Sequence, residues 1–115
     1  MNLVRYKFNC KIIKLFRLGN RQLEIIFCPA RSTVPIHYHS SVDSLIIHIY
    51  GSGLMNRNDN KRLIDKFTWF NCFFIPHGVL HGIEIFNNWF IFLNWERWYP
   101  AIKPTTIADD IAYER

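Results

Sequence analysis

Three histidines stand at spacings that suit a metal ion. His37 and His39 are two residues apart, and His81 follows the Pro76-x-Gly78 turn signal later in the chain. Side chains two apart on an extended strand point to the same face, so the first two imidazoles converge. Imidazole, together with carboxylate, suits Fe, Mn, Ni, Co and Zn. The spacing makes His37 and His39 candidate ligands of one divalent transition metal whose identity is open, and a barrel that pairs the two segments would add His81.

Asp43 has the same parity as the first two histidines and offers a carboxylate to the same site. If the strand continues without a bulge, Leu45, Ile47 and Ile49 also face inward and form an apolar wall behind the metal. Asp43 is therefore predicted to bind the metal directly, to bind it through a water, or to act as a catalytic base. His48 lies on the opposite parity and is predicted to be hydrogen-bonded or exposed.

Short strands are the elements that must position these residues. Half of the chain is apolar, with ten Phe, five Tyr and four Trp, and no segment has the pattern of a helix of ordinary length. This composition, broken by frequent turn signals, predicts an all-β sandwich or small barrel. Asn87-Asn88 is predicted to be the hairpin turn before the last strand. The predicted strands cover 3–16, 21–28, 43–50, 66–74, 82–86 and 89–95.

The two histidine segments resemble the two motifs of the cupin superfamily. Residues 35–43 with Gly51 are similar to the first motif, in which His-x-His precedes an acid and a glycine, and residues 76–81 are similar to the second. The resemblance covers about residues 21–97. It implies a single double-stranded β-helix, or jelly-roll, barrel with a metal at its centre. The metal ligands that it implies are His37, His39, Asp43 and His81.

The chain departs from the cupin motifs at four positions. Arg31 and Phe70 stand where the motifs usually have glycine, and Ile85 replaces a frequent asparagine. Asp43 replaces the usual glutamate. Because Asp is one methylene shorter than Glu and metal–ligand distances vary by only a few tenths of an ångström, this replacement weakens Asp43 as a direct ligand.

Length and cysteine usage bound the organisation of the chain. With 115 residues it fits one domain, which we divide into a barrel over 1–100 and a C-terminal tail over 101–115. Thr105 or Thr106 caps a short helix in that tail, or the tail lies loosely on the surface. Three cysteines without a CxxC spacing indicate no disulfide framework, and no stretch has the length of a membrane span. A cytoplasmic protein is predicted.

Three functions are compatible with these features. The first is a metal-dependent enzyme of dioxygenase, isomerase or lyase type that acts on a small, possibly anionic, organic molecule. The second is a non-catalytic module that binds a small metabolite or sugar with the metal or with Arg31 and Arg57. The third, a nucleic-acid binder, ranks last, because the seven basic residues within 1–31 belong to no recognised module.

A homodimer is also predicted. Apolar residues occupy both faces of 44–50 and 89–95, which exceeds what the interior of one small barrel holds.

Overall fold

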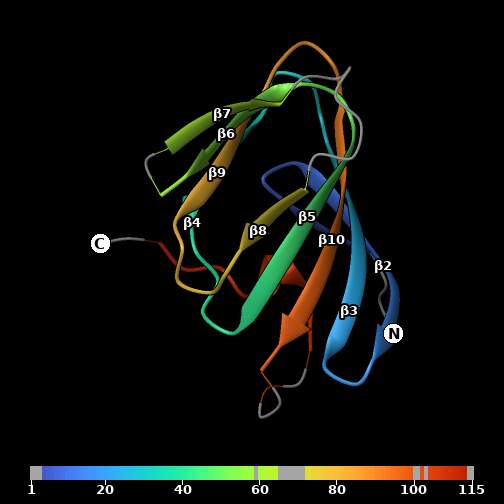
Figure 1. The fold of residues 1–115 in the computed structure, drawn as a ribbon. Coiled ribbons are helices and arrows are strands. Elements are labelled where there is room, and N and C mark those ends of the chain that lie inside the picture. Colours follow the sequence, from blue (N-terminus) through green and yellow to red (C-terminus); the bar gives the residue numbers. More distant parts are fainter. Residues whose placement is uncertain (1–3, 59, 65–71, 100–101, 103, 114–115) are drawn as a thin grey trace.

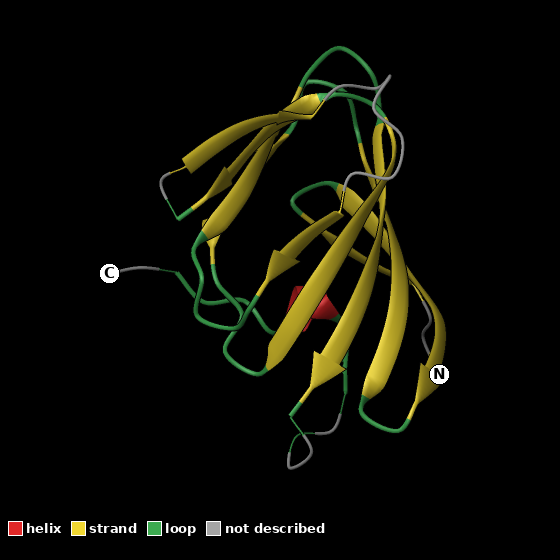
Figure 2. Cartoon of the chain, viewed as in Figure 1, coloured by secondary structure: helices red, strands yellow, loops and turns green. Residues whose placement is uncertain are grey.

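The computed structural model describes residues 4–58, 60–64, 72–99, 102 and 104–113 as strands, loops and one short 3-10 helix (Figure 2). The predicted all-β class is confirmed, and the strand over 21–28 has the predicted bounds. Most of the strand predicted over 66–74 lies outside the described residues. The elements are β1 Val4–Lys7, β2 Cys10–Leu18, β3 Arg21–Cys28, β4 Thr33–His37, β5 Val42–Tyr50, β6 Gly53–Arg57, β7 Asn60–Ile64, β8 Cys72–Ile75, β9 His81–Ile85, β10 Phe90–Trp98 and η1 Ile107–Asp109.

The strands form two antiparallel sheets that face each other (Figure 1). One sheet has six strands in the order β1-β2-β3-β10-β5-β8, and the other has four in the order β4-β9-β6-β7. Apolar side chains from both sheets, such as Ile26, Met55, Ile83 and Phe92, fill the space between them. This is the jelly-roll architecture that the sequence predicted.

The predicted hairpin at Asn87-Asn88 is wrong. Strand β9 pairs with β4 and β6, whereas β10 pairs with β3 and β5, so the segment between them crosses from one sheet to the other. Main-chain bonds hold the crossing, since Phe86 N–H donates to the Ser52 carbonyl at 3.1 Å. Gly51 permits its close packing, because a Cβ at this position would lie 2.1 Å from the Trp89 carbonyl oxygen.

The inward parity of β5 also differs from the prediction. Val42, Ser44, Ile46 and His48 are buried, whereas Leu45 and Ile47 are half-buried and lie on the outer face. Strand β4 ends at His37 and the chain bends at residues 40–41, so the alternation does not continue from His39 into β5.

The C-terminal strap, which we define as residues 104–113, packs against the barrel. Ile107 and Ala108 in η1 are buried, and Thr106 occupies the N-cap position. Main-chain hydrogen bonds of 2.9 and 2.8 Å pair Tyr38 with Ala112. Of the two predicted alternatives for the tail, a short helix is found, but it is a three-residue 3-10 helix and the Thr106 side chain makes no capping hydrogen bond. No helix among the described residues is long and apolar enough to cross a membrane.

Candidate metal centre

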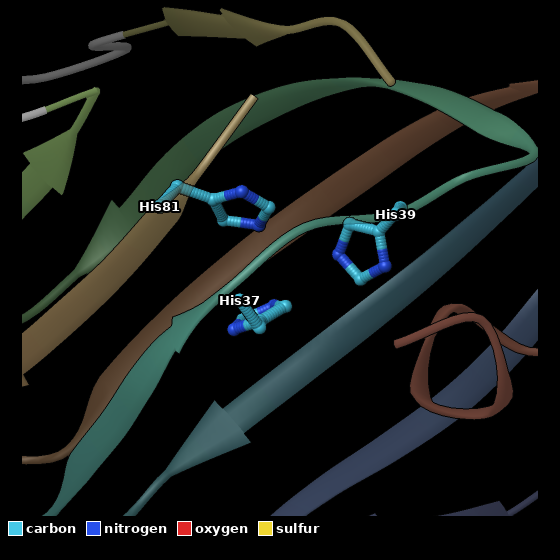
Figure 3. A group of neighbouring side chains, drawn as sticks. All are labelled: His37, His39 and His81. Atoms are coloured by element: carbon cyan, nitrogen blue, oxygen red, sulfur yellow. The ribbon is translucent and has the colours of Figure 1, made fainter. Parts of the chain in front are cut away.

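The fold brings His37, His39 and His81 together between the two sheets (Figure 3). His37 and His81 are register partners on β4 and β9, and their ring centroids lie 4.4 Å apart. Gly82 lets these strands approach, because a Cβ there would lie 2.7 Å from the Val34 carbonyl oxygen. One ring nitrogen from each histidine lies within 4.8 Å of the others. The three rings converge on one point.

Main-chain carbonyls fix the tautomer of all three rings. The Nδ1–H of His37 donates to Pro35 O at 2.6 Å, and that of His81 donates to Val79 O at 2.9 Å. The Nδ1–H of His39 donates to the carbonyl of Asp110 in the C-terminal strap. A neutral imidazole that donates from Nδ1 keeps its lone pair on Nε2. The ring set therefore fits a divalent transition metal, whose histidine ligands are held in this way.

Burial keeps the three imidazoles neutral. It lowers the pKa of His37, with the charge of Lys7 as a further cause. It also lowers the pKa of His39 to about 4 and that of His81 to about 3, and for these two the neighbouring histidines are further causes. Since a proton and a metal compete for the same nitrogen, low pKa values keep the nitrogens available at neutral pH.

We expect the metal-free protein to lose stability as the pH falls from about 6.5 toward 3. An unfolded histidine takes up a proton near pH 6.5, whereas the folded His39 and His81 do so only near pH 4 and 3. The unfolded state thus binds more protons within this window, and acid favours unfolding with a slope approaching ~1.4 kcal/mol per pH unit for each histidine. Urea titrations between pH 4 and 7.5 measure the slope, and a free energy of unfolding that does not change across this range would contradict the expectation.

The structure does not bring Asp43 to the three histidines. Its carboxylate accepts hydrogen bonds from the main-chain N–H and the ring Nδ1 of His77, both at 2.8 Å, and the Tyr99 hydroxyl contacts the same ring. Because the parity changes between His39 and β5, Ser44 takes the inward position that the resemblance assigns to an acid. Asp43 instead ties the 76–78 turn to the start of β5.

The histidines line a cavity of about 70 Å³. Its wall also contains two polar residues that were not predicted from the sequence, Ser44 on β5 and Asn94 on β10. Both are polar residues at inward positions of strands, which is a signal that becomes readable only when the parity of each strand is known. Apolar side chains make up most of the remaining wall, including Ile107, Ala108 and Ile111 of the C-terminal strap.

Two groups of hydrogen bonds fasten the C-terminal strap. The Asp110 carboxylate accepts bonds from Ser41 N–H at 2.9 Å and from the Ser40 hydroxyl at 3.1 Å. Further along the barrel, the buried Glu24 carboxylate accepts bonds from the Thr106 hydroxyl and from the N–H of Ile107, both at 2.8 Å. The strap thus holds the carbonyl that orients His39 and also forms part of the cavity wall.

A second buried carboxyl lies beside Glu24. Burial, followed by the adjacent Glu24, raises the pKa of Glu96 well above its usual value. Two adjacent carboxyls in a buried site keep a proton between them, because both cannot ionise without mutual repulsion. Gln22, Asn94 and Trp98 donate to Glu96 at 2.9–3.1 Å and complete this polar layer beneath the cavity.

The chain has the architecture of solved cupin structures. The chain superposes on the cupin domain of Cnp3 from Schizosaccharomyces pombe with a TM-score of 0.72 and 13% identity, over 85% of this chain and 71% of that one. A predicted oxalate decarboxylase from Thermotoga maritima gives 0.68 and 19%, over 78% and 81%. Salicylate 1,2-dioxygenase from Pseudoaminobacter salicylatoxidans gives 0.67 and 10%, over 76% of this chain and 25% of that one.

These likenesses show that the chain has the cupin fold, as the sequence motifs predicted. No protein-family model and no curated protein sequence matches the chain. At these identities the shared fold does not specify the reaction, so the function is argued from the site.

Proposed function

We propose that this chain is a metal-dependent cupin that acts on a small organic molecule. The observation that carries the proposal is the set of three buried histidines whose Nδ1–H groups are all held by carbonyls, which leaves three Nε2 lone pairs at one cavity. A divalent transition metal on these nitrogens supplies Lewis-acid polarisation and, as Fe(II), oxygen activation. A dioxygenase, isomerase or lyase reaction is compatible with such a site.

The residues of the chain supply a preorganised and largely apolar environment. Apolar side chains make up most of the cavity wall, and the C-terminal strap contributes part of it. Lys7 lies at the edge of the cavity with an exposed side chain, where it attracts anions toward the histidines. We assign Asp43 to the support of the 76–78 turn and not to proton transfer, because its carboxylate is bound to His77.

A non-catalytic binding module is the second candidate. It is favoured by one observation, which is that no carboxylate belongs to the described residues lining the cavity. An enzyme at this site would therefore rely on the metal and not on a side-chain base.

Metal analysis of the purified protein tests whether the chain binds a metal ion, which both candidate functions require. After loading with Fe(II), Co(II) or Zn(II) and removal of excess metal, we expect one ion per chain. Less than a tenth of an ion would overturn the proposal. Incubation of the loaded protein with a library of small carboxylates then separates the candidates, since an enzyme consumes a compound that a module only binds.

We also propose that the protein is a cytoplasmic homodimer. Cys10, Cys28 and Cys72 form no disulfide, which agrees with a reducing compartment. The outer face of the six-stranded sheet supports the dimer, because apolar residues on five neighbouring strands are register partners and form continuous rows across the sheet. One row consists of Phe16, Leu23, Trp95, Leu45 and Phe74, and the next consists of Ile13, Ile25, Leu93, Ile47 and Cys72.

Face-to-face packing of this sheet on a second copy is expected to make the dimer. A block of five strands about 4.8 Å apart is wide enough for an interface of ~800 Å² per partner. Trp95→Glu should convert the dimer to a monomer in sedimentation equilibrium, because it places a charge at the centre of the face. Leu63→Glu, an exposed apolar position on β7 of the four-stranded sheet, is the control outside this face. A wild-type protein that is monomeric at high micromolar concentration would contradict the dimer.

A further inference from the structure

Two buried polar atoms in the cavity wall have no hydrogen-bond partner among the residues that the structure describes. They are the hydroxyl oxygen of Ser44 and the side-chain oxygen of Asn94. The two residues are only 3% and 2% exposed, and both line the cavity with the three histidines. Buried polar groups are almost always hydrogen-bonded, so an orphaned pair facing one cavity indicates that something binds there.

The two atoms are neighbours on the inner face of the six-stranded sheet. Ser44 is the register partner of Glu96, and Asn94 is the register partner of Ile46, so the orphaned residues are diagonal neighbours on β5 and β10. Diagonal pairs of this kind lie within reach of a common small group. They form one polar patch in a wall that is otherwise largely apolar.

The hydrogen bonds of Asn94 define what this patch accepts. Its Nδ2 donates to the Glu96 carboxyl at 3.1 Å, which directs the amide and leaves Oδ1 as a free acceptor. The Ser44 hydroxyl can both donate and accept. Asn94 Oδ1 and the Ser44 hydroxyl together suit a hydroxyl group of a ligand. The ligand hydroxyl donates its hydrogen to Asn94 Oδ1 and accepts a hydrogen bond from the Ser44 hydroxyl.

Charge and size restrict the rest of the ligand. Lys7 is the only charged residue among the described residues that line the cavity, and the volume of about 70 Å³ admits only a few non-hydrogen atoms. An anionic end would therefore lie toward Lys7 and the histidines, and a neutral end would lie at the polar patch.

We propose that the cavity binds a small hydroxycarboxylate, with its hydroxyl on Ser44 and Asn94 and its carboxylate toward the metal site. The assignment rests on the proposed metal function, because the carboxylate is taken to bind beside the three histidines. It makes Ser44 and Asn94 the residues that determine specificity.

Glycolate and propanoate test the assignment, because they differ only by a hydroxyl in place of a methyl group. Their Kd values are measured with the Co(II)-loaded protein from the visible spectrum of the metal. The ratio of the propanoate Kd to the glycolate Kd should fall about tenfold in Ser44→Ala and in Asn94→Leu relative to wild type, since each variant removes one hydrogen-bonding group. Comparing ratios between proteins cancels the intrinsic affinity of glycolate for the metal.

The variants differ in their effect on folding, and this keeps the test decisive. Ser44→Ala removes an atom with no partner, so its melting temperature should equal or exceed that of wild type. Asn94→Leu also removes a bond to Glu96 and is expected to be less stable. Asp43→Asn, which lies outside the cavity wall, is the control and should keep the wild-type ratio.

The outcomes separate the two proposals. If wild type binds no metal, the proposed function fails. If all proteins bind Co(II) and the ratio is the same in wild type and Ser44→Ala, the proposed function stands, ordered water satisfies the polar patch, and the hydroxycarboxylate assignment is wrong. A lower ratio in Ser44→Ala with unchanged Co(II) affinity supports it.

Discussion

Replacing His37 and His81 by alanine in the same chain is expected to abolish binding of first-row divalent metals. The two residues face each other across β4 and β9, so the double variant leaves His39 as the remaining member of the set. One imidazole in a cavity whose described lining residues include no carboxylate cannot hold an ion that requires several ligands. Elemental analysis and Co(II) titration should show one ion per chain in wild type and none in the variant.

Asp43→Asn is the comparison that makes this result specific. The side chain keeps its size and can still accept from the main-chain N–H of His77, so the variant should bind metal with wild-type stoichiometry. A loss of metal in Asp43→Asn would instead return Asp43 to the ligand set that the cupin resemblance implied. Unchanged stoichiometry in the double histidine variant would remove the metal site altogether.

The acid sensitivity of the metal-free protein provides an independent check on folding. The double variant lacks two of the imidazoles that must remain neutral in the folded state, so its stability should depend less on pH than that of wild type. A variant that loses metal but folds with this flatter pH profile has lost ligands and not its structure.

Features that depend on local patterns were predictable from the sequence. The alternation in 21–28 identifies a strand with its observed bounds, and the spacing of the histidines identifies residues that the barrel brings together. The strand is determined by residues that are close in sequence, and the histidine set is identified by a known motif.

Features that depend on strand breaks and sheet membership were not predictable. The bend at residues 40–41 shifts the inward–outward alternation of side chains by one residue. As a result, Asp43 faces outward and Ser44 faces inward. A one-residue shift moves every following side chain to the opposite face of the sheet, and the strand propensities of the residues do not indicate such a shift. The crossing near Asn87 fails for a similar reason, because a short polar turn looks the same whether it joins partners in one sheet or links two sheets.

The outer face of the barrel illustrates a third limit. In Gln22-Leu23-Glu24-Ile25 the polar residues are buried and the apolar residues face outward, which is the reverse of the usual pattern. A reading of the sequence alone would place Glu24 in solvent. The inversion is consistent with an interior that contains a polar layer and with the proposal that the outer face packs on a second copy.

Deleting residues 104–115 is expected to lower metal affinity about 10- to 100-fold, which is the loss typical when groups that orient metal-binding histidines are removed. The deletion takes away the Asp110 carbonyl that holds His39, together with the cavity wall formed by Ile107 and Ala108. It also exposes the buried Glu24 carboxylate, so the melting temperature should fall.

A point variant tests the same role without removing part of the core. Asp110→Ala removes the carboxylate that fastens the C-terminal strap to Ser40 and Ser41, so the strap can move and the Asp110 carbonyl leaves His39 for part of the time. We expect the Zn(II) Kd, measured by competition with a chromophoric chelator, to rise about tenfold. Asp109→Ala is the matched control, because Asp109 is the adjacent acid and its side chain is exposed. Equal Kd values for the two variants would show that the strap only covers the barrel, whereas a selective loss in Asp110→Ala assigns it the orientation of His39.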